Sequence, residues 1–455
     1  MMTTFLPADS HRFHERQITF APTNHLLTNL GVWSHDGNWI YYDVRSDAAG
    51  SLFDGTRIER VNVESGDVEV VYQAQHGACV GVVTASPCED KIVFIHGPEN
   101  PSDDWAYAAW HRRGVTLELQ SRNPGTPHSV ANLDARDLVP PYTAGALRGG
   151  THVHVISGDG RWISFTYEDH VLATSADANA QQNQRNVGVS VTDSAVLVPA
   201  THPRNHAGEA FSVLVTKTVD RPNPGSDEIL RAYSDAWVGS NGYVRSDRSR
   251  QTRALAFIGD VVTQSGDVVP ELFVVDVPDD VTVAGDAPLC GTASTRPEPP
   301  RGTVQRRLTH TAERKHPGLG NVRHWPRSSP DGSKIAFLMR DDAGLTQLWL
   351  ASPIEPGIRQ LTHNEFSIES AFTFRCDGLA IACVVGGCVC EVDVCNGKTT
   401  PLTSPTDPAI KPRPEAVVYS PDGTRVAYLR PDMSVAGTTN QVFVAETQWG
   451  RENER

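Results

Sequence analysis

Two histidines placed two residues apart, His152 and His154, are the feature of this sequence that most directly indicates chemistry. Side chains at i and i+2 of a β-strand point to the same side, so we expect both imidazoles to face one space. Imidazole nitrogens bind divalent transition metals and accept protons near neutral pH. The pair therefore predicts either a metal site or two core histidines with satisfied hydrogen bonds.

The elements that carry these residues follow from a repeated turn. Residues 327–362 alternate apolar and polar side chains in short runs that are separated by Pro330-Asp331-Gly332, by Asp341 to Gly344 and by Pro356-Gly357. Four short strands with turn residues between them are typical of one propeller blade. Glycine in the Asp-Gly turn supplies the positive φ that such a turn requires.

Six copies of this unit are recognisable from their turns. They begin at Ser34, Ser86, Ser157, Ser329, Arg375 and Ser420. The last three are 46 and 45 residues apart, which is the spacing of blades. We predict an all-β protein, a single β-propeller of four-stranded blades, with seven blades and with eight as the alternative count. Gln17 to Phe20 is expected to close the ring beside Val442 to Ala445.

The predicted propeller forms a single domain over residues 1–455. The repeat is hard to follow in a degenerate blade region at 171–276, where 222–239 is interpreted as a short helix or a long loop. Residues 278–302, rich in Pro, Asp, Thr and Gly, are predicted to be an exposed insertion.

Aligning the repeats places equivalent residues in a ring about the propeller axis. Five residues before each turn serine stand His152, His324 and Glu415, among others. The register predicts that these three side chains converge near one mouth of the central channel. The alternative is that they are ordinary channel-lining groups bound to water.

The Ser-Pro-Asp-Gly-x-x-Ile-Ala-Phe core of these repeats resembles that of the TolB-type propellers, a resemblance that covers most of the chain. The Gly-Thr-His-Val-His block, residues 150–154, resembles still more an uncharacterised bacterial family of TolB-like propellers. It also resembles, locally, the oligogalacturonate lyases, seven-bladed propellers in which a His-x-His pair before a Ser-Pro-Asp-Gly turn binds a divalent metal. In that family a Gln three residues before the pair also binds metal, and here that position is Gly149.

The lyase resemblance implies roles for particular residues. It implies His152, His154 and His324 as metal ligands, with His202 or His206 as alternatives to His324. The metal would be Mn, with Fe, Ni or Zn as alternatives. We expect His170 to be the catalytic base, and Arg148 or Arg204 to hold a substrate carboxylate. Four residues are candidates for contact with the substrate: Tyr167, Trp325, Arg323 and Glu415.

These roles would make the protein a metal-dependent carbohydrate-active lyase that acts by β-elimination on a uronate-containing oligosaccharide at the channel mouth. In that reaction a base removes the proton α to a carboxylate whose charge is neutralised. The alternative is a non-enzymatic TolB-like propeller that binds a protein or peptide partner. The sequence shows no Gly-x-Ser-x-Gly or His-Glu-x-x-His motif, and the histidines near the channel mouth are what favours the enzyme over the binding protein.

Composition restricts the classes of partner that the protein can bind and its expected location. The net charge is −14, which argues against a nucleic-acid partner, because nucleic acids bind basic faces. No apolar run is long enough to span a membrane, and residues 1–17 contain no apolar segment like that of a secretory signal, so a cytoplasmic location is expected. Five of the eight cysteines lie between Cys376 and Cys395 without a Cys-x-x-Cys pair, which favours buried strand residues over a zinc site.

Overall fold

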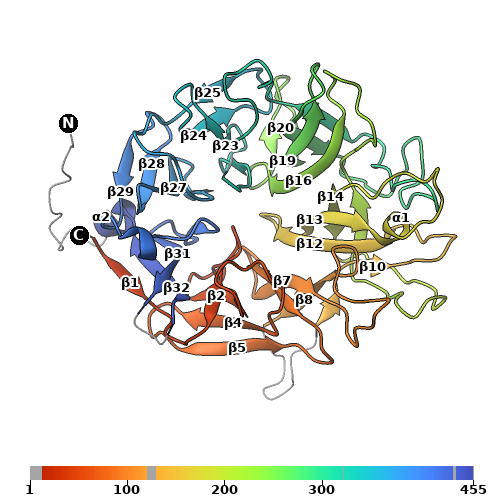
Figure 1. The fold of residues 1–455 in the computed structure, drawn as a ribbon, viewed down its shortest axis with the longest axis horizontal. Coiled ribbons are helices and arrows are strands. Elements are labelled where there is room, and N and C mark those ends of the chain that lie inside the picture. Colours follow the sequence, from red (N-terminus) through yellow and green to blue (C-terminus); the bar gives the residue numbers. More distant parts are fainter. Residues whose placement is uncertain (1–12, 120–129, 321, 434–436, 454–455) are drawn as a thin grey trace.

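Seven four-stranded antiparallel sheets form a ring in this protein. The computed structural model describes residues 13–119, 130–320, 322–433 and 437–453, and Figure 1 shows the sheets arranged as successive blades around an axis. Within the described residues these are the only sheets with more than two strands. The predicted all-β propeller with seven blades is thus confirmed, and the alternative count of eight is wrong. Residues 1–12, on which part of the expected location depends, lie outside the described residues.

The strands of the first three blades follow one another along the chain. Blade 1 comprises β2 (Asn24–Leu26), β3 (Trp39–Arg45), β4 (Arg57–Asn62) and β5 (Val68–Gln73). Blade 2 comprises β6 (Val80–Ala85), β7 (Lys91–His96), β8 (Arg113–Glu118) and β9 (Ala131–Asn132). Blade 3 comprises β12 (Gly149–Ile156), β13 (Trp162–Asp169), β14 (Asn186–Val191) and β15 (Phe211–Leu214).

The remaining blades repeat the pattern, and the last one takes a strand from the other end of the chain. Blade 4 comprises β16 (Ile229–Trp237), β19 (Arg253–Val262), β20 (Val268–Val277) and β21 (Val304–Arg307). Blade 5 comprises β22 (Arg327–Ser328), β23 (Ile335–Arg340), β24 (Thr346–Ala351) and β25 (Ile358–Gln360). Blade 6 comprises β26 (Thr373–Phe374), β27 (Ala380–Val385), β28 (Cys388–Asp393) and β29 (Thr399–Pro401). Blade 7 comprises β30 (Val417–Tyr419), β31 (Arg425–Asp432), β32 (Thr439–Glu446) and β1 (Glu15–Gln17).

Short elements join the blades. Two small sheets pair β10 (Ala135–Arg136) with β11 (Ala146–Leu147), and β17 (Tyr243–Val244) with β18 (Arg250–Gln251). The helical elements are α1 (His170–Ala173), the 3₁₀ turn η1 (Pro408–Ile410) and α2 (Gln448–Asn453). No helix among the described residues has both the length and the apolar character that crossing a membrane requires.

The repeated turn owes its shape to a local hydrogen bond. In blades 3 and 7 the serine hydroxyl donates to the aspartate two residues later at 2.6 Å, and the same oxygen accepts the N–H five residues on at 3.0 Å. The glycine that follows has φ near +75°, a conformation that costs residues with a Cβ free energy. Because all partners lie within six residues, this turn is readable from the sequence.

The ring closes where the two ends of the chain meet. The strand β1 pairs antiparallel with β32, with Glu15 opposite Ala445 and Gln17 opposite Phe443. In Figure 1 the red β1 lies beside the blue β31 and β32. The predicted closure is confirmed, with the strand two residues earlier than expected.

The apolar core lies between blades rather than at the axis. Clusters of buried side chains join each blade to the next, for instance Tyr42 and Val61 of blade 1 with Ala427 and Val444 of blade 7. These strands bury both faces, which explains their nearly continuous runs of Val, Ile, Ala and Phe. The boundary between blades 2 and 3 has a smaller apolar cluster and buries polar groups, among them Asp134 and His154.

Two sequence-based expectations require correction. Residues 229–237 form the innermost strand of blade 4 and not a helix or a long loop. The segment 278–303 does connect β20 to β21 outside the sheet, but it is not simply exposed, because Val281, Leu289 and Arg296 are buried.

Candidate functional site

A cavity of about 460 Å³ opens near the start of the inner strands of blades 3 and 4. We call it the axial pocket. Blade 3 contributes His152, Thr166 and Arg185, blade 4 contributes Arg231, Tyr233 and Ser234, and the segment before β22 contributes Arg323, His324 and Trp325. Its size is that of an ordinary small-ligand site, and its lining mixes apolar, aromatic and cationic groups.

Three arginines line the axial pocket, and two of them are already paired. Arg185 forms an ion pair with Glu168, and Arg231 forms one with Asp260. Arg323 has no ion pair with a carboxylate among the described residues, and its guanidinium carbon lies 4.9 Å from the centre of the Trp325 ring. Burial lowers the pKa of Arg323, with a further contribution from the charge of Arg185. The pocket therefore keeps one cationic group for a ligand.

His152 is the titratable group of the axial pocket that has an unused nitrogen. Its Nδ1 is buried and has no hydrogen-bond partner among the described residues. Burial, followed by the nearby charges of Arg112 and Arg185, lowers the pKa of His152 well below its ordinary value. The imidazole is therefore neutral at neutral pH, so one of its nitrogens is a donor and the other an acceptor.

His154 does not share that space, which contradicts the predicted common side. The ladder between β12 and β13 shifts register between His152 and Val155, and the intervening Val153 has φ = +54°. This bulge turns the fully buried His154 toward Gly114 of blade 2, and its Nε2 lies 3.0 Å from the hydroxyl of Thr151 in its own strand.

The bulge recurs in the neighbouring blades. The inner strands β6 and β16 shift register between Gly81 and Thr84 and between Tyr233 and Ala236. Val82, which follows Gly81, and Ser234, which follows Tyr233, again have φ near +57°. A left-handed conformation is a genuine outlier for valine, and strain of this kind concentrates at functional sites.

His324 lines the axial pocket, but its two nitrogens serve the backbone. Its Nδ1 donates to the carbonyl of Val322 at 2.9 Å, and its Nε2 accepts the N–H of Leu338 at 3.2 Å. In blade 6 the hydroxyl of Ser370 accepts the equivalent N–H of Val384 at 2.8 Å. Both nitrogens are thus occupied, so the predicted role of His324 as a metal ligand does not fit.

The structure brings only part of the predicted ring together. His152 and His324 both line the axial pocket, as do Arg323 and Trp325 from the candidate substrate contacts. Glu415 forms an ion pair with Arg413 at 2.6 Å and does not line the pocket. Its charge only partly offsets the lowering of the pKa of Arg323 by burial. Arg185, Arg231 and Tyr233 were not among the predicted site residues. Arg185 belongs to no turn motif, and the interpretation of 222–239 as a loop hid Arg231 and Tyr233.

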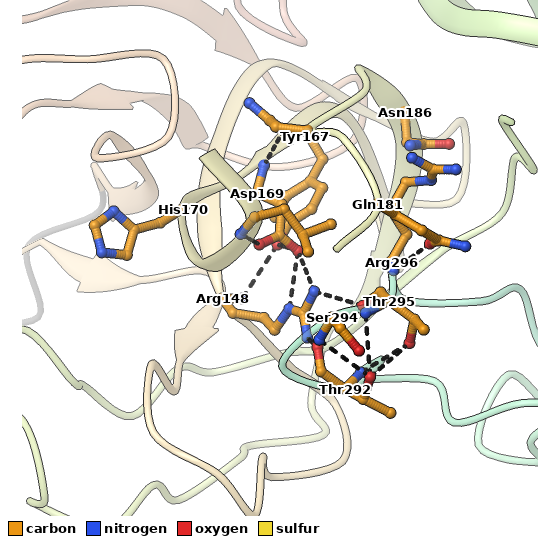
Figure 2. Close-up of polar contacts among 12 residues, drawn as sticks. Arg148, Tyr167, Asp169, His170, Gln181, Asn186, Thr292, Ser294, Thr295 and Arg296 are labelled. Carbon is orange, nitrogen blue, oxygen red and sulfur yellow. Dashed lines mark hydrogen bonds and ion pairs between the residues drawn. The ribbon is translucent and has the colours of Figure 1, made fainter. Parts of the chain in front are cut away.

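Arg148 and Tyr167 belong to a buried polar network, which Figure 2 shows. Arg148 is 0% exposed, and its guanidinium pairs with Asp169 at 2.8 Å and donates to the carbonyls of Thr292 and Thr295. The hydroxyl of Tyr167 donates to the same Asp169 at 3.1 Å. Neither side chain lines the axial pocket, so the roles predicted for them in substrate contact do not fit this geometry.

His170 points away from that network in Figure 2. Its ring lies in an aromatic cluster around Trp105, with the two ring centres 4.8 Å apart. Its Nδ1 lies 3.0 Å from Nε2 of His111, whose ring stacks on Trp105 with centroids 3.8 Å apart. Burial, then the charge of His111, lowers the pKa of His170 to about 4. His170 does not line the axial pocket, so it is not placed to act as the base there.

A second cavity, of about 230 Å³, adjoins this cluster, and we call it the Trp105 pocket. It is lined by Glu99, Trp105, Arg113, Arg136, Arg204 and His206, among others. His202 lies beside it, with its ring centre 6.2 Å from that of Trp105. The structure therefore places Arg204, His202 and His206 together, but in a different cavity from His152.

The candidate metal ligands do not assemble into a metal site. His152 lies in the axial pocket, His154 between blades 2 and 3, and His202 and His206 at the Trp105 pocket, while His324 is occupied by the backbone. Within the described ranges no three residues of the types His, Cys, Asp and Glu form a group that could hold a metal ion. The residues present therefore do not fit the manganese site that the resemblance implied.

Comparisons with two solved lyase structures show the fold. An oligogalacturonate lyase in complex with manganese aligns with a TM-score of 0.54 at 10% identity, over 96% of this chain and 94% of the lyase. The oligogalacturonate lyase of Vibrio parahaemolyticus aligns over the same shares with a TM-score of 0.52 at 10% identity. A putative TolB from Agrobacterium tumefaciens aligns over 86% of this chain and 98% of its own, at 15% identity and a TM-score of 0.38.

Comparisons of sequence show the family to which the chain belongs. The model of a protein family of unknown function, DUF3748, matches residues 79–206, which span blade 2 and much of blade 3. The uncharacterised protein YidR of Escherichia coli strain K12 is 48% identical over 418 residues, 91% of this chain and 94% of YidR. At this identity and coverage, the chain belongs to the same family of propellers as YidR.

Proposed function

We propose that the protein binds a uronate-containing oligosaccharide in the axial pocket and cleaves it by β-elimination. The observation that carries the proposal is that Arg323 and the neutral His152 line one cavity. Arg323 has no ion pair with a carboxylate among the described residues. The likeness of the fold to two oligogalacturonate lyases agrees with the proposal and does not carry it.

The charges of the axial pocket suit one carboxylate at a time. Glu168 and Asp260 neutralise Arg185 and Arg231, so Arg323 leaves a net charge of about +1. A guanidinium binds a carboxylate through two parallel hydrogen bonds, which fixes the orientation of a uronate ring. The aromatic rings of Tyr233 and Trp325, which also line the cavity, offer apolar faces to the sugar.

The proposed chemistry uses the residues present. Arg323 holds the carboxylate and neutralises the charge that develops on it, so the α proton becomes more acidic. His152 accepts that proton, the electrons of the C–H bond form a C=C bond, and the C–O bond to the leaving sugar breaks. The leaving oxygen takes a proton from solvent. Because the low pKa of His152 makes it a weak base, the reaction depends strongly on charge neutralisation by Arg323.

The direct test is to incubate the protein with saturated oligogalacturonates and follow ultraviolet absorbance, which rises when the unsaturated product forms. We expect His152→Gln to lower the rate by about 10² to 10⁴, the usual contribution of a general base. Arg323→Ala is expected to weaken ligand binding about 10- to 100-fold, because one charged hydrogen-bonding partner is lost. Arg301→Ala, an exposed arginine of the 278–303 segment, is the matched control.

The outcomes separate the alternatives. Binding by calorimetry that Arg323→Ala abolishes, without any absorbance change, would leave a carbohydrate-binding propeller rather than a lyase. No binding and no absorbance change would overturn the proposal. In that case the predicted alternative, a propeller that binds a protein or peptide partner, is the next to test.

A further inference from the structure

We propose that the Trp105 pocket binds the phosphate group of a small phosphate monoester. This pocket shares none of its lining residues with the axial pocket, so the inference stands apart from the proposed lyase activity. Three features of the lining support it: its charge, the fixed position of one arginine, and a buried nitrogen without a partner.

The charge of the lining matches a dianion. Arg113, Arg136 and Arg204 line the pocket, and Glu99 is the one carboxylate among the described residues that does so. Glu99 lies 3.1 Å from Arg113 and neutralises one charge. The buried Asp134 lies near Arg136, and burial raises the pKa of that carboxyl, which lessens its charge, so the lining carries at most about +2. A phosphate monoester carries nearly two negative charges at neutral pH, whereas a uronate carries one. The concentration of positive charge is marked in a chain whose net charge is −14.

Hydrogen bonds to the backbone fix the guanidinium of Arg136, which lines the pocket. Only 2% of it is exposed, and its Nε and Nη2 donate to the backbone carbonyls of Gly149, His111 and Arg112. None of these three bonds uses its Nη1. Because the other donors fix the guanidinium, little side-chain entropy is lost when an anion binds Nη1.

Arg204 and His206 bring further donors from another chain segment. Arg204 donates to the carbonyls of Glu99 and Asn100 at 2.9 and 3.2 Å, which holds its guanidinium 5.6 Å from the centre of the Trp105 ring. The Nε2 of His206 is buried, and no described residue hydrogen-bonds to it. Burial, then the charge of Arg136, lowers the pKa of His206 well below its ordinary value, so the ring is neutral before a ligand binds. A bound oxyanion would raise that pKa, and the protonated ring would then donate from Nε2, so that binding takes up a proton.

The arrangement suits a tetrahedral oxyanion better than a planar carboxylate. The donors come from the start of β8, from β10 and from the loop before β15, so they approach the cavity from three separate segments. A volume of about 230 Å³ admits a phosphate group with a few carbon atoms attached. We infer that the pocket recognises the phosphate and only a small part of the rest of the ligand.

The test is isothermal titration of the full chain with inorganic phosphate at constant ionic strength, followed by small sugar phosphates. We expect saturable binding that Arg204→Ala weakens about 10- to 100-fold. Glu99→Gln is expected to tighten binding, because it removes the competing carboxylate and frees Arg113. Arg323→Ala, which changes only the axial pocket, is the control and should bind phosphate like the wild type.

The variants act in opposite directions, so misfolding cannot imitate the expected result. Tighter binding in Glu99→Gln together with weaker binding in Arg204→Ala supports the proposal. Absence of phosphate binding to the wild type overturns it. Equal binding in all variants overturns it too, as does loss of binding only in Arg323→Ala, which would place the anion in the axial pocket.

Discussion

At the scale of single residues, His324 shows how a side chain can replace a backbone carbonyl as a hydrogen-bond acceptor in a propeller blade. Five residues before the turn serine, the inner strand of blade 5 no longer pairs regularly with its neighbour, and His324 accepts the N–H of Leu338. Ser370 does the same for Val384 in blade 6. A buried N–H without an acceptor costs free energy, so these side chains complete the ladder. This role explains why a histidine lies on the wall of the axial pocket without being free to bind a ligand.

Protonation of His324 would remove that acceptor, so we predict that acid destabilises the protein through this residue. Burial lowers the pKa of folded His324 to about 4, below the ordinary value of 6.5. The unfolded chain therefore binds more protons between pH 6.5 and 4, and the free energy of unfolding falls as the pH falls through this window. The contribution of this one group is about 1.4 kcal/mol per pH unit. Urea unfolding at several pH values measures it.

The matched variant is His324→Ser, which copies the acceptor of blade 6. It leaves a smaller side chain and lowers the overall stability, but it removes the titrating group. The slope of stability against pH should therefore be shallower by about 1.4 kcal/mol per pH unit between pH 6.5 and 4. An unchanged slope would show that His324 does not titrate as its surroundings indicate.

At the scale of elements, the 278–303 segment is held to blade 3 by side chains rather than by strand pairing. Arg148 reaches it from the start of β12, and Arg296 reaches back from the segment to Asp220 and to the carbonyl of Gln182. The pairing of Arg148 with Asp169 is fully buried, and Asp169 also caps α1 by accepting the N–H of Leu172. One arginine therefore links a blade, a helix and an insertion.

We predict that Arg148→Met destabilises the protein by about 3–5 kcal/mol, because it leaves the carboxylate of Asp169 buried without its partner. The 278–303 segment should also become more sensitive to proteolysis, since two of its carbonyls lose their donors. Arg301→Met, in the same segment but exposed, should change the stability by no more than about 0.5 kcal/mol. Equal rates of proteolysis in the two variants would contradict the proposal that Arg148 holds the 278–303 segment to blade 3.

At the scale of the whole molecule, stability depends on the closure of the ring by β1. Beyond the strand pairing, Glu15 accepts hydrogen bonds from the hydroxyl of Tyr428 and from Arg430, which lies at 2.6 Å. Both partners belong to β31, so the side chain of Glu15 reaches past β32. The two ends of the chain are therefore joined by backbone and by side chains across three strands.

We predict that Glu15→Ala lowers the free energy of unfolding by about 2 kcal/mol, because Tyr428 and Arg430 lose a charged partner. His14→Ala is the control, since its side chain is largely exposed and lies 3.9 Å from Glu446. That variant should stay within about 0.5 kcal/mol of the wild type. Thermal unfolding of the two variants distinguishes them, and equal melting temperatures would argue against a role of Glu15 in closure.

The parts of this structure that the sequence predicted depend on neighbours along the chain. The turn at Ser157 and Asp159 is bonded within itself, so its six copies reveal six of the blades, whereas blade 4 lies in the region where the repeat is hard to follow. His154 was misplaced because a bulge at Val153 breaks the alternation of side chains, and a valine at that position gives no sign of it. Arg148 was misassigned because its acceptors, Thr292 and Thr295, lie more than 140 residues away in the chain. Contacts of that range cannot be read from spacing.

The closure by β1 also has a consequence for how the protein is made. The ribosome completes β32 about 430 residues after β1, which at ordinary rates of translation is roughly 20 to 90 seconds later. During that time β1 has no strand to pair with, and an unpaired apolar strand would invite aggregation. Its sequence, Glu15-Arg16-Gln17, is wholly polar. The first strand of the ring can therefore remain solvated and unpaired until the last blade is synthesised.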